Sequence, residues 1–152
     1  MATPLASALR GFAVVALLAT GCSTTPTLKR LECSGSIRRS VVFDTQTGQL
    51  YSYLPDRSVY WPTPELRFSV QTNSSLRDGS LVIETRVGEF SGEGDAATWA
   101  AVEPPVGHTT TINLSSLKET FVALTGRPGV QIPDRHGLCR WAPLQTQKIE
   151  PS

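Results

Sequence analysis

The sequence has little of what nucleic-acid-binding and membrane-spanning proteins depend on. Its 152 residues carry fourteen lysines and arginines against thirteen acidic residues. A nucleic-acid-binding surface usually gives a chain a strong basic excess, so this near balance argues against such a partner. A spanning helix needs about 20 apolar residues, and the apolar run at 11–21 is well short of that length.

The motifs of common enzyme classes are also missing. The nucleophile turn G-x-S-x-G of α/β hydrolases does not occur. The carboxylates are too scattered to nominate a glycosidase pair, and Gly92-Glu93-Gly94 lacks the strand-then-helix setting of a phosphate loop. His108 and His136 lack ligand spacing to each other, and His136 beside Cys139 would be half a metal site. We therefore expect no enzyme activity, cofactor or metal, with a hydrolase of unrecognised type as the alternative.

What the sequence does have is a leader that ends in a cysteine. Arg10 precedes the apolar run at 11–21, which ends in small residues and is followed by Cys22. This is the layout of a secretory signal peptide. The segment Leu18-Ala19-Thr20-Gly21-Cys22 resembles the lipobox of bacterial lipoproteins, in which a peptidase cleaves before the cysteine once diacylglycerol is attached to its sulfur. Ala19 stands where that pattern prefers leucine.

The resemblance implies that residues 1–21 are removed and that acylated Cys22 anchors the chain in a lipid bilayer. Such lipoproteins usually carry three acyl chains, and each buried methylene contributes about 0.8 kcal/mol, so attachment is effectively permanent. Ser23 is typical of export to the outer membrane, where the protein faces the periplasm; the inner membrane is the alternative. An ordinary signal peptide would instead release a soluble periplasmic protein with a free Cys22. An apolar N-terminal helix of a cytosolic protein is a third interpretation.

The other two cysteines allow one intramolecular pairing. With Cys22 acylated, Cys33 and Cys139 remain, and an oxidising periplasm favours a disulfide between them. The bond would join the start of the domain to its end. Closing a loop of about 100 residues gives on the order of 4–5 kcal/mol in the chain-entropy model, as an upper figure. Two separate buried thiols are the alternative.

The rest of the chain alternates apolar and polar residues with a period of two, which is typical of β-strands. The clearest hairpin pairs 66–71 with 81–87, joined by turn residues that include Asn73 and Asp78-Gly79. Further strands are expected at 36–43, 49–54, 109–114 and 137–141.

Two other segments are harder to assign. Residues 88–107 are rich in glycine and proline and are expected to be mostly loop, with a helical turn at 95–101 capped by Asp95. Residues 116–125 begin with a capping-box pattern that favours a helix, but their β-forming residues make a strand our expectation. About seven short strands then form an all-β domain, either a small antiparallel sandwich or a barrel.

We divide the chain into a signal peptide (1–21), a lipidated tether (22–31), a β domain (32–142) and a flexible tail (143–152). A domain of this size buries enough surface to form its own core. The last expected strand and its flank, 137–143, are similar to the corresponding part of small exported bacterial β domains.

Aromatic residues are concentrated in one stretch, which holds Tyr51, Tyr53, Tyr60, Trp61 and Phe68. Tyrosine and tryptophan are enriched at the surfaces through which proteins bind partners. Tyr60 and Trp61, in an expected loop between prolines, are therefore the predicted partner-binding residues; the structural alternative is that these aromatics fill the core and cover an edge. The sequence predicts a membrane-anchored periplasmic lipoprotein that binds another envelope protein, with a small barrel carrying an apolar ligand or glycan as the alternative.

Overall fold

The computed structural model describes residues 25–35, 40–94 and 97–145. The expected signal peptide, Cys22 and residues 146–152 of the expected tail lie outside these ranges. No helix within them is long and apolar enough to cross a membrane. In chain order the elements are β1 (Leu28–Cys33), β2 (Ser40–Asp44), β3 (Leu50–Leu54), the 3-10 turn η1 (Pro55–Arg57), β4 (Val59–Pro62), β5 (Leu66–Arg67), β6 (Val70–Arg77), β7 (Ser80–Ser91), β8 (Thr98–Ala101), β9 (Val106–Asn113), β10 (Lys118–Thr125) and β11 (Arg135–Ala142).

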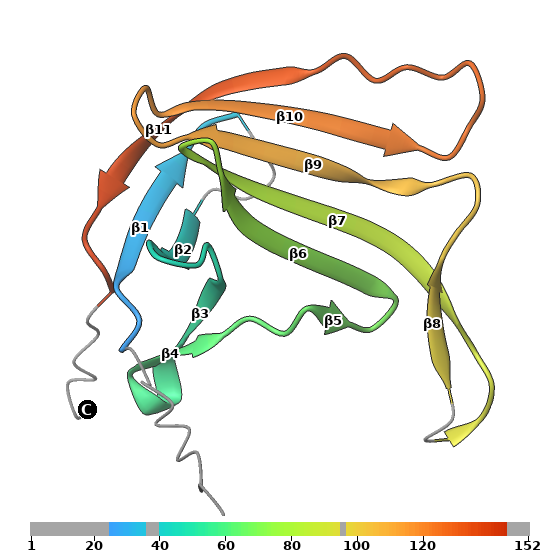
Figure 1. Ribbon diagram of the computed structural model, residues 1–152, viewed down its shortest axis with the longest axis horizontal. Helices are drawn as coiled ribbons and strands as arrows, with labels where there is room; N and C mark the ends of the chain where they lie inside the picture. Colours follow the sequence, from blue (N-terminus) through green and yellow to red (C-terminus); the bar gives the residue numbers. More distant parts are fainter. Residues whose placement is uncertain (1–24, 36–39, 95–96, 146–152) are drawn as a thin grey trace, which may run out of the picture.

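All the strands belong to one open antiparallel sheet (Figure 1). Their order is β4-β3-β2-β1-β11-β10-β9-β7-β6-β5, and β8 pairs with the end of β7. The predicted all-β class is confirmed, although the sheet has 11 strands instead of about seven. β1 begins at Leu28, so residues 28–31 of the expected tether belong to the sheet.

The sheet curls until its two edges approach each other. The edge strands β4 and β5 are consecutive in sequence, and the segment between them forms hydrogen bonds to both sides of the gap. The Thr63 amide donates to the Leu50 carbonyl on one side at 2.8 Å, and the Thr72 amide on the other side donates to the Glu65 carbonyl at 2.6 Å. This segment, residues 63–65, therefore bridges the gap and gives the open sheet a barrel-like shape.

The turn between β2 and β3 closes the same side of the molecule. Gly48 in this turn has φ +80°, and a Cβ there would lie 2.7 Å from the Leu76 nitrogen of β6. Glycine is required on both counts, because it accepts the left-handed conformation and leaves room for the approaching backbone.

The curl encloses a hydrophobic core formed by β1, β2, β3 and β11 together with β7 and β9, in the left half of Figure 1. The core residues alternate along each strand with residues of the outer face, as expected for a sheet with one wet side. The buried members are Leu31, Cys33, Val41, Phe43, Leu50, Leu81, Ile83, Ile112 and Cys139.

The hairpin of β6 and β7 is correctly predicted in outline. Asp78 (φ 49°) and Gly79 (φ 72°) form its two-residue turn, and Arg77 pairs with Ser80 directly beside it. Two consecutive positive φ values are typical of the type I′ turn that Asp-Gly favours. Asn73, which was expected in the turn, lies within β6.

The expected first strand of that hairpin, 66–71, is wrong in its middle. Phe68 and Ser69 form a tight turn between β5 and β6, with Arg67 paired to Val70. The alternation of apolar residues runs straight through this turn, so the pattern gives no sign that the chain reverses. Phe68 is consequently 81% exposed and does not pack in the core.

The expected loop and helical turn within 88–107 are also largely wrong. β7 continues to Ser91, and 98–101 form β8 against it, with Phe90 opposite Trp99. The Trp99 ring lies directly on Gly88, where a Cβ would overlap it. The absent side chain at position 88 thus makes room for the paired strand; Asp95, the expected cap, lies outside the described residues.

The strand expected at 116–125 is confirmed as β10. The polar residues before it form a turn, in which the Asn113 side-chain oxygen accepts hydrogen bonds from the amides of Ser115 and Ser116 at 3.1 and 2.8 Å. Turns of this kind use the same side-chain-to-backbone bonding as a helix cap, which explains why the sequence resembles a capping box.

Candidate functional site

Cys33 and Cys139 form a disulfide between the first and last strands. The two residues lie directly opposite each other in the register of β1 and β11, and each is 7% exposed. The predicted pairing is confirmed, and the alternative of two separate thiols is excluded. Both ends of the domain are therefore fixed in the middle of the sheet.

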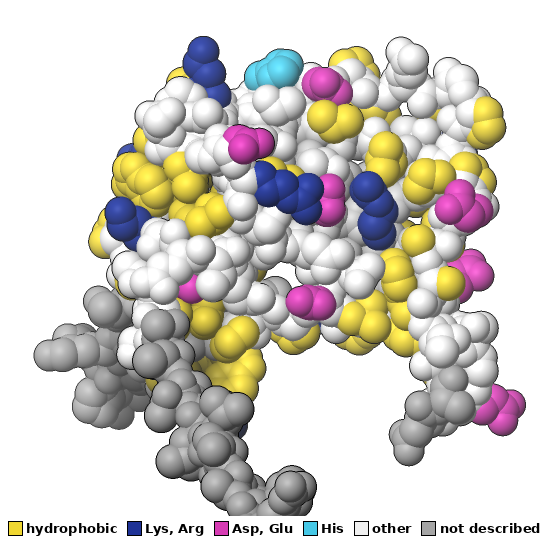
Figure 2. All heavy atoms as spheres, viewed as in Figure 1, with side chains coloured by type: hydrophobic (Ala, Val, Ile, Leu, Met, Phe, Trp, Pro, Cys, Tyr) yellow, Lys and Arg dark blue, Asp and Glu magenta, His cyan; other side chains and the backbone are white. Residues whose placement is uncertain are grey.

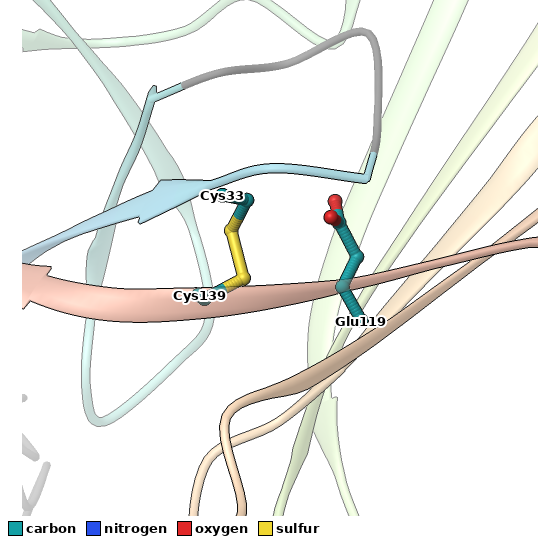
Figure 3. Close-up of side chains that lie close together, drawn as sticks. All are labelled: Cys33, Glu119 and Cys139. Carbon is teal, nitrogen blue, oxygen red and sulfur yellow. A yellow bond between two sulfur atoms is a disulfide. The ribbon is translucent and has the colours of Figure 1, made fainter.

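Glu119 of β10 lies beside this disulfide (Figure 3). Its side chain is 1% exposed, and its Oε2 accepts a hydrogen bond from the Gly35 amide at 3.0 Å, whereas Oε1 has no hydrogen-bond partner. Among the described residues, this is the only group of cysteine, histidine or acidic side chains whose ligand atoms all lie within 4.8 Å. Because the two sulfurs are bonded to each other, they offer no thiolate to a metal ion. The cluster therefore has a structural role: the disulfide links β1 to β11, and Glu119 holds the chain that follows β1.

Two glycines make this cluster possible. A Cβ on Gly35 would lie 2.6 Å from the Gly137 Cα, and one on Gly137 would lie 2.9 Å from Glu119 Oε2. Larger residues would separate the chain after β1 from β11 and remove the amide that binds Glu119. No pattern in the sequence indicates this arrangement, because its members are far apart in the chain.

Tyr60 and Trp61 lie in the edge strand β4 and not in a loop, which corrects the prediction. After η1 the chain reverses at Ser58 (φ 52°), so that Tyr60 pairs with Tyr53 and Trp61 with Ser52 of β3. Backbone pairing thus uses a segment whose flanking prolines favoured a loop assignment.

The structure does not bring Tyr60 and Trp61 to one surface. Adjacent strand residues point to opposite faces, so the two side chains diverge. The ring centroids of Tyr60 and Tyr53 lie 5.1 Å apart, and the Tyr60 hydroxyl accepts a hydrogen bond from the Gln145 amide at 2.6 Å. Trp61 is 58% exposed. Tyr60 is therefore used within the fold, and Trp61 is available at the surface.

Exposed apolar side chains follow Trp61 along both edges of the sheet. We call Val59, Trp61, Leu66 and Phe68 the edge surface; they are 43%, 58%, 39% and 81% exposed. They lie on β4, β5 and the turn after β5, which form the lower border in Figure 1. Figure 2 shows hydrophobic side chains recurring along this border. Large exposed apolar groups beside open strand edges are typical of interaction surfaces.

Sequence reasoning missed Val59, Leu66 and Phe68 as members of the edge surface, and the most exposed of these is Phe68. Its backbone has φ +55°, a conformation that is unfavourable for a bulky side chain and is usually left to glycine or asparagine. The neighbouring Ser69 carbonyl accepts a hydrogen bond from Trp99 Nε1 at 3.2 Å, which ties this turn to β8. Retained strain of this kind points to a role for the exposed ring.

The two histidines occupy different faces of the sheet. His108 pairs with Ala123, and its ring lies 5.0 Å from the ring of Phe121, two residues earlier on the same face of β10. His136 pairs with Thr120, which lies on the other face, and its Nδ1 is 3.4 Å from the Thr120 hydroxyl. The two imidazoles therefore do not form a shared site.

Asp44, the last residue of β2, holds the start of β1. Its carboxylate accepts hydrogen bonds from the Thr27 amide at 3.1 Å, the Gln46 amide at 3.2 Å and the Thr47 hydroxyl at 2.9 Å. Burial alone raises the pKa of Asp44, but these hydrogen bonds together outweigh it and hold the pKa below its ordinary value. The fold therefore stabilises the charged form of the Asp44 carboxylate.

No protein-family model matches this chain, and neither does any curated protein or solved structure. The resemblance of its leader to a lipobox therefore rests on the residues quoted above. Its function is inferred from the chemistry and exposure of its own side chains.

Proposed function

We propose that this protein is a lipid-anchored module that binds a protein partner in the bacterial envelope, held by acylated Cys22 on the periplasmic side of the outer membrane. The observation that carries the proposal is the distribution of the three cysteines. Two of them are joined in a buried disulfide, which leaves Cys22 for modification. A disulfide that joins the two ends of a domain also suits an oxidising compartment outside the cytoplasm.

The edge surface is the part of the described chain best suited to a protein partner. Trp61 and Phe68 present large rings with few rotatable bonds, as binding hot spots commonly do. They lie on or beside edge strands, whose outer backbone groups can pair with a strand of another protein. Trp61 contacts the partner in this proposal, and Tyr60 holds β4 in place through Tyr53.

A carrier of an apolar ligand or glycan is the less favoured function. The space inside the curl is filled by core side chains such as Leu31, Phe43 and Ile83, each 0% exposed. A hollow at the seam between β3 and β6 measures about 60 Å³. Sites for small molecules usually measure about 300–1,000 Å³. The described part of the molecule has hollows of about 500, 780 and 440 Å³, but these are open depressions on the surface and do not lie inside the curl. The packed interior therefore supports the binding module.

The anchor is tested by replacing its cysteine. We expect Cys22→Ser to abolish fatty-acid labelling and to leave an uncleaved or soluble product, because the serine hydroxyl does not form the thioether. The control is the double variant Cys33→Ser/Cys139→Ser, which keeps the anchoring residue and is expected to remain labelled. Mass spectrometry of the mature amino terminus gives the readout, and labelling that persists in Cys22→Ser contradicts the anchor.

The partner surface is tested by photo-crosslinking in intact cells. A photoreactive residue at position 61, 66 or 68 should yield a crosslinked protein of one mass. The matched control is Val122 on β10, whose exposed fraction of 37% is close to the 39% of Leu66. Crosslinks that are equally strong at position 122, or absent at all three edge positions, contradict the edge surface as the binding site.

A further inference from the structure

The start of the folded domain is held firmly, and this limits how far it can stand from its anchor. The Thr27 amide donates to Asp44 Oδ1 at 3.1 Å, and the Thr27 carbonyl accepts from the Thr45 amide at 2.9 Å. Only four residues separate Thr27 from Cys22. At no more than about 3.6 Å per residue, even a fully extended connection reaches only about 18 Å.

The surface around this attachment point carries apolar and basic side chains together. We call Leu28, Lys29, Trp141 and Leu144 the anchor-side surface; with Arg30 and Ala142 they line a depression of about 260 Å³. Trp141 is 44% and Leu144 36% exposed. The Lys29 ammonium lies 5.1 Å from the centroid of the Trp141 ring, so a cation and an aromatic ring share one site.

The Trp141 ring is held in position and does not lie loosely on the surface. It stacks against the buried ring of Phe43, with ring centroids 6.3 Å apart. A fixed, half-exposed indole beside a lysine is typical of membrane–water interfaces, where the ring lies among the headgroups and the ammonium reaches the phosphates.

We infer that the anchor-side surface rests on phospholipid headgroups and makes a second membrane contact beside the acyl chains. The inference rests on the proposed acylation of Cys22, because the short connection is what brings this surface to the bilayer. It fixes the orientation of the domain: Lys29 and Trp141 face the lipid, and β8, on the side of the molecule opposite β1 in Figure 1, lies farther from it.

Tryptophan fluorescence tests this orientation in the full lipidated chain. Of the three tryptophans, Trp141 lies on the anchor-side surface and Trp99 on β8, so they form an internal pair. The variants Trp61→Phe/Trp99→Phe and Trp61→Phe/Trp141→Phe leave one reporter each. Both are reconstituted into vesicles of phosphatidylcholine and phosphatidylglycerol, with and without bromine on the phosphatidylcholine acyl chains.

We expect the brominated lipid to quench Trp141 emission several-fold and to leave Trp99 emission unchanged. Adding Lys29→Glu to the Trp141 reporter should weaken the quenching, because a carboxylate repels the lipid phosphates. Equal quenching of the two tryptophans, or none, overturns the inference. Mass spectrometry of the same samples distinguishes failure of the orientation from failure of the anchor. An acylated chain with unquenched Trp141 contradicts only the orientation. An unmodified amino terminus contradicts both the anchor and the orientation. Circular dichroism of each variant checks that the sheet is intact.

Discussion

The two ends of the curled sheet differ in how they use their phenylalanines. At the closed end, where β1–β3 face β7 and β9, Phe43 is 0% exposed. At the open end, formed by β5, β8 and the outer part of β7, Phe68 is 81% and Phe90 52% exposed. Burial at one end supplies most of the stability, which leaves the other end free to present rings at the surface without the need to be tightly packed.

The sharpest test of this contrast replaces one phenylalanine at each end. We expect Phe43→Ala to lower the free energy of unfolding by about 3–5 kcal/mol, because it leaves a cavity in a closed core. Phe90→Ala, at a half-exposed position, should change it by about 0.5 kcal/mol or less. Urea denaturation followed by circular dichroism measures both. Equal losses would show that the open end is as tightly packed in solution as the closed end.

A smaller effect is expected at Asp44, which ties the turn after β2 to the start of β1. Because folding lowers the pKa of Asp44, its stabilisation is present above the pKa of the unfolded chain and is lost as the pH falls through the folded value. Asp44→Asn should lower the free energy of unfolding by about 1–3 kcal/mol at neutral pH, which is the usual contribution of hydrogen bonds to a charged group.

Thermal unfolding between neutral and acid pH measures this second effect. The stability of the wild-type chain should approach that of Asp44→Asn as the pH falls, because protonation removes the same charge. Two parallel pH profiles would contradict a stabilising role for the Asp44 carboxylate.

The smallest effect on stability is expected at the turn of the edge surface. Phe68→Gly relieves the left-handed backbone and should raise the free energy of unfolding by about 0.5–1 kcal/mol, since glycine adopts this conformation without strain but loses more chain entropy on folding. The same change removes the exposed ring, so crosslinking through position 61 should weaken. A variant that is more stable and still binds normally would show that the ring has no part in recognition.

Local signals in the sequence predicted those parts of the fold that depend on neighbouring residues. The Asp78-Gly79 turn was found because a two-residue hairpin has specific backbone needs. The disulfide between Cys33 and Cys139 is not a local feature; it was predicted because assigning Cys22 to the lipid anchor leaves one possible pair. The turn at Phe68 was missed because a bulky residue with positive φ contradicts local preference, and only the surrounding sheet holds it there.

Contacts between distant segments set most of the candidate site. Trp61 was predicted to lie in a loop, but it lies on an edge strand whose place depends on pairing with β3. The approach of Gly35 and Gly137, and the burial of Glu119 beside them, join residues from opposite ends of the domain. A pattern along the chain has no information about such distances, so these features emerge only with the structure.

The neighbouring positions of β1 and β11 have a consequence for how the domain folds. The central pairing of the sheet joins β1 to β11, and the cysteines that face each other in this pair are 106 positions apart in the sequence. Until the two strands meet, β1 lacks one of its two neighbours and the middle of the sheet stays unassembled. The order of the strands therefore makes completion of the sheet depend on a contact of long sequence separation, which is typical of slowly folding proteins.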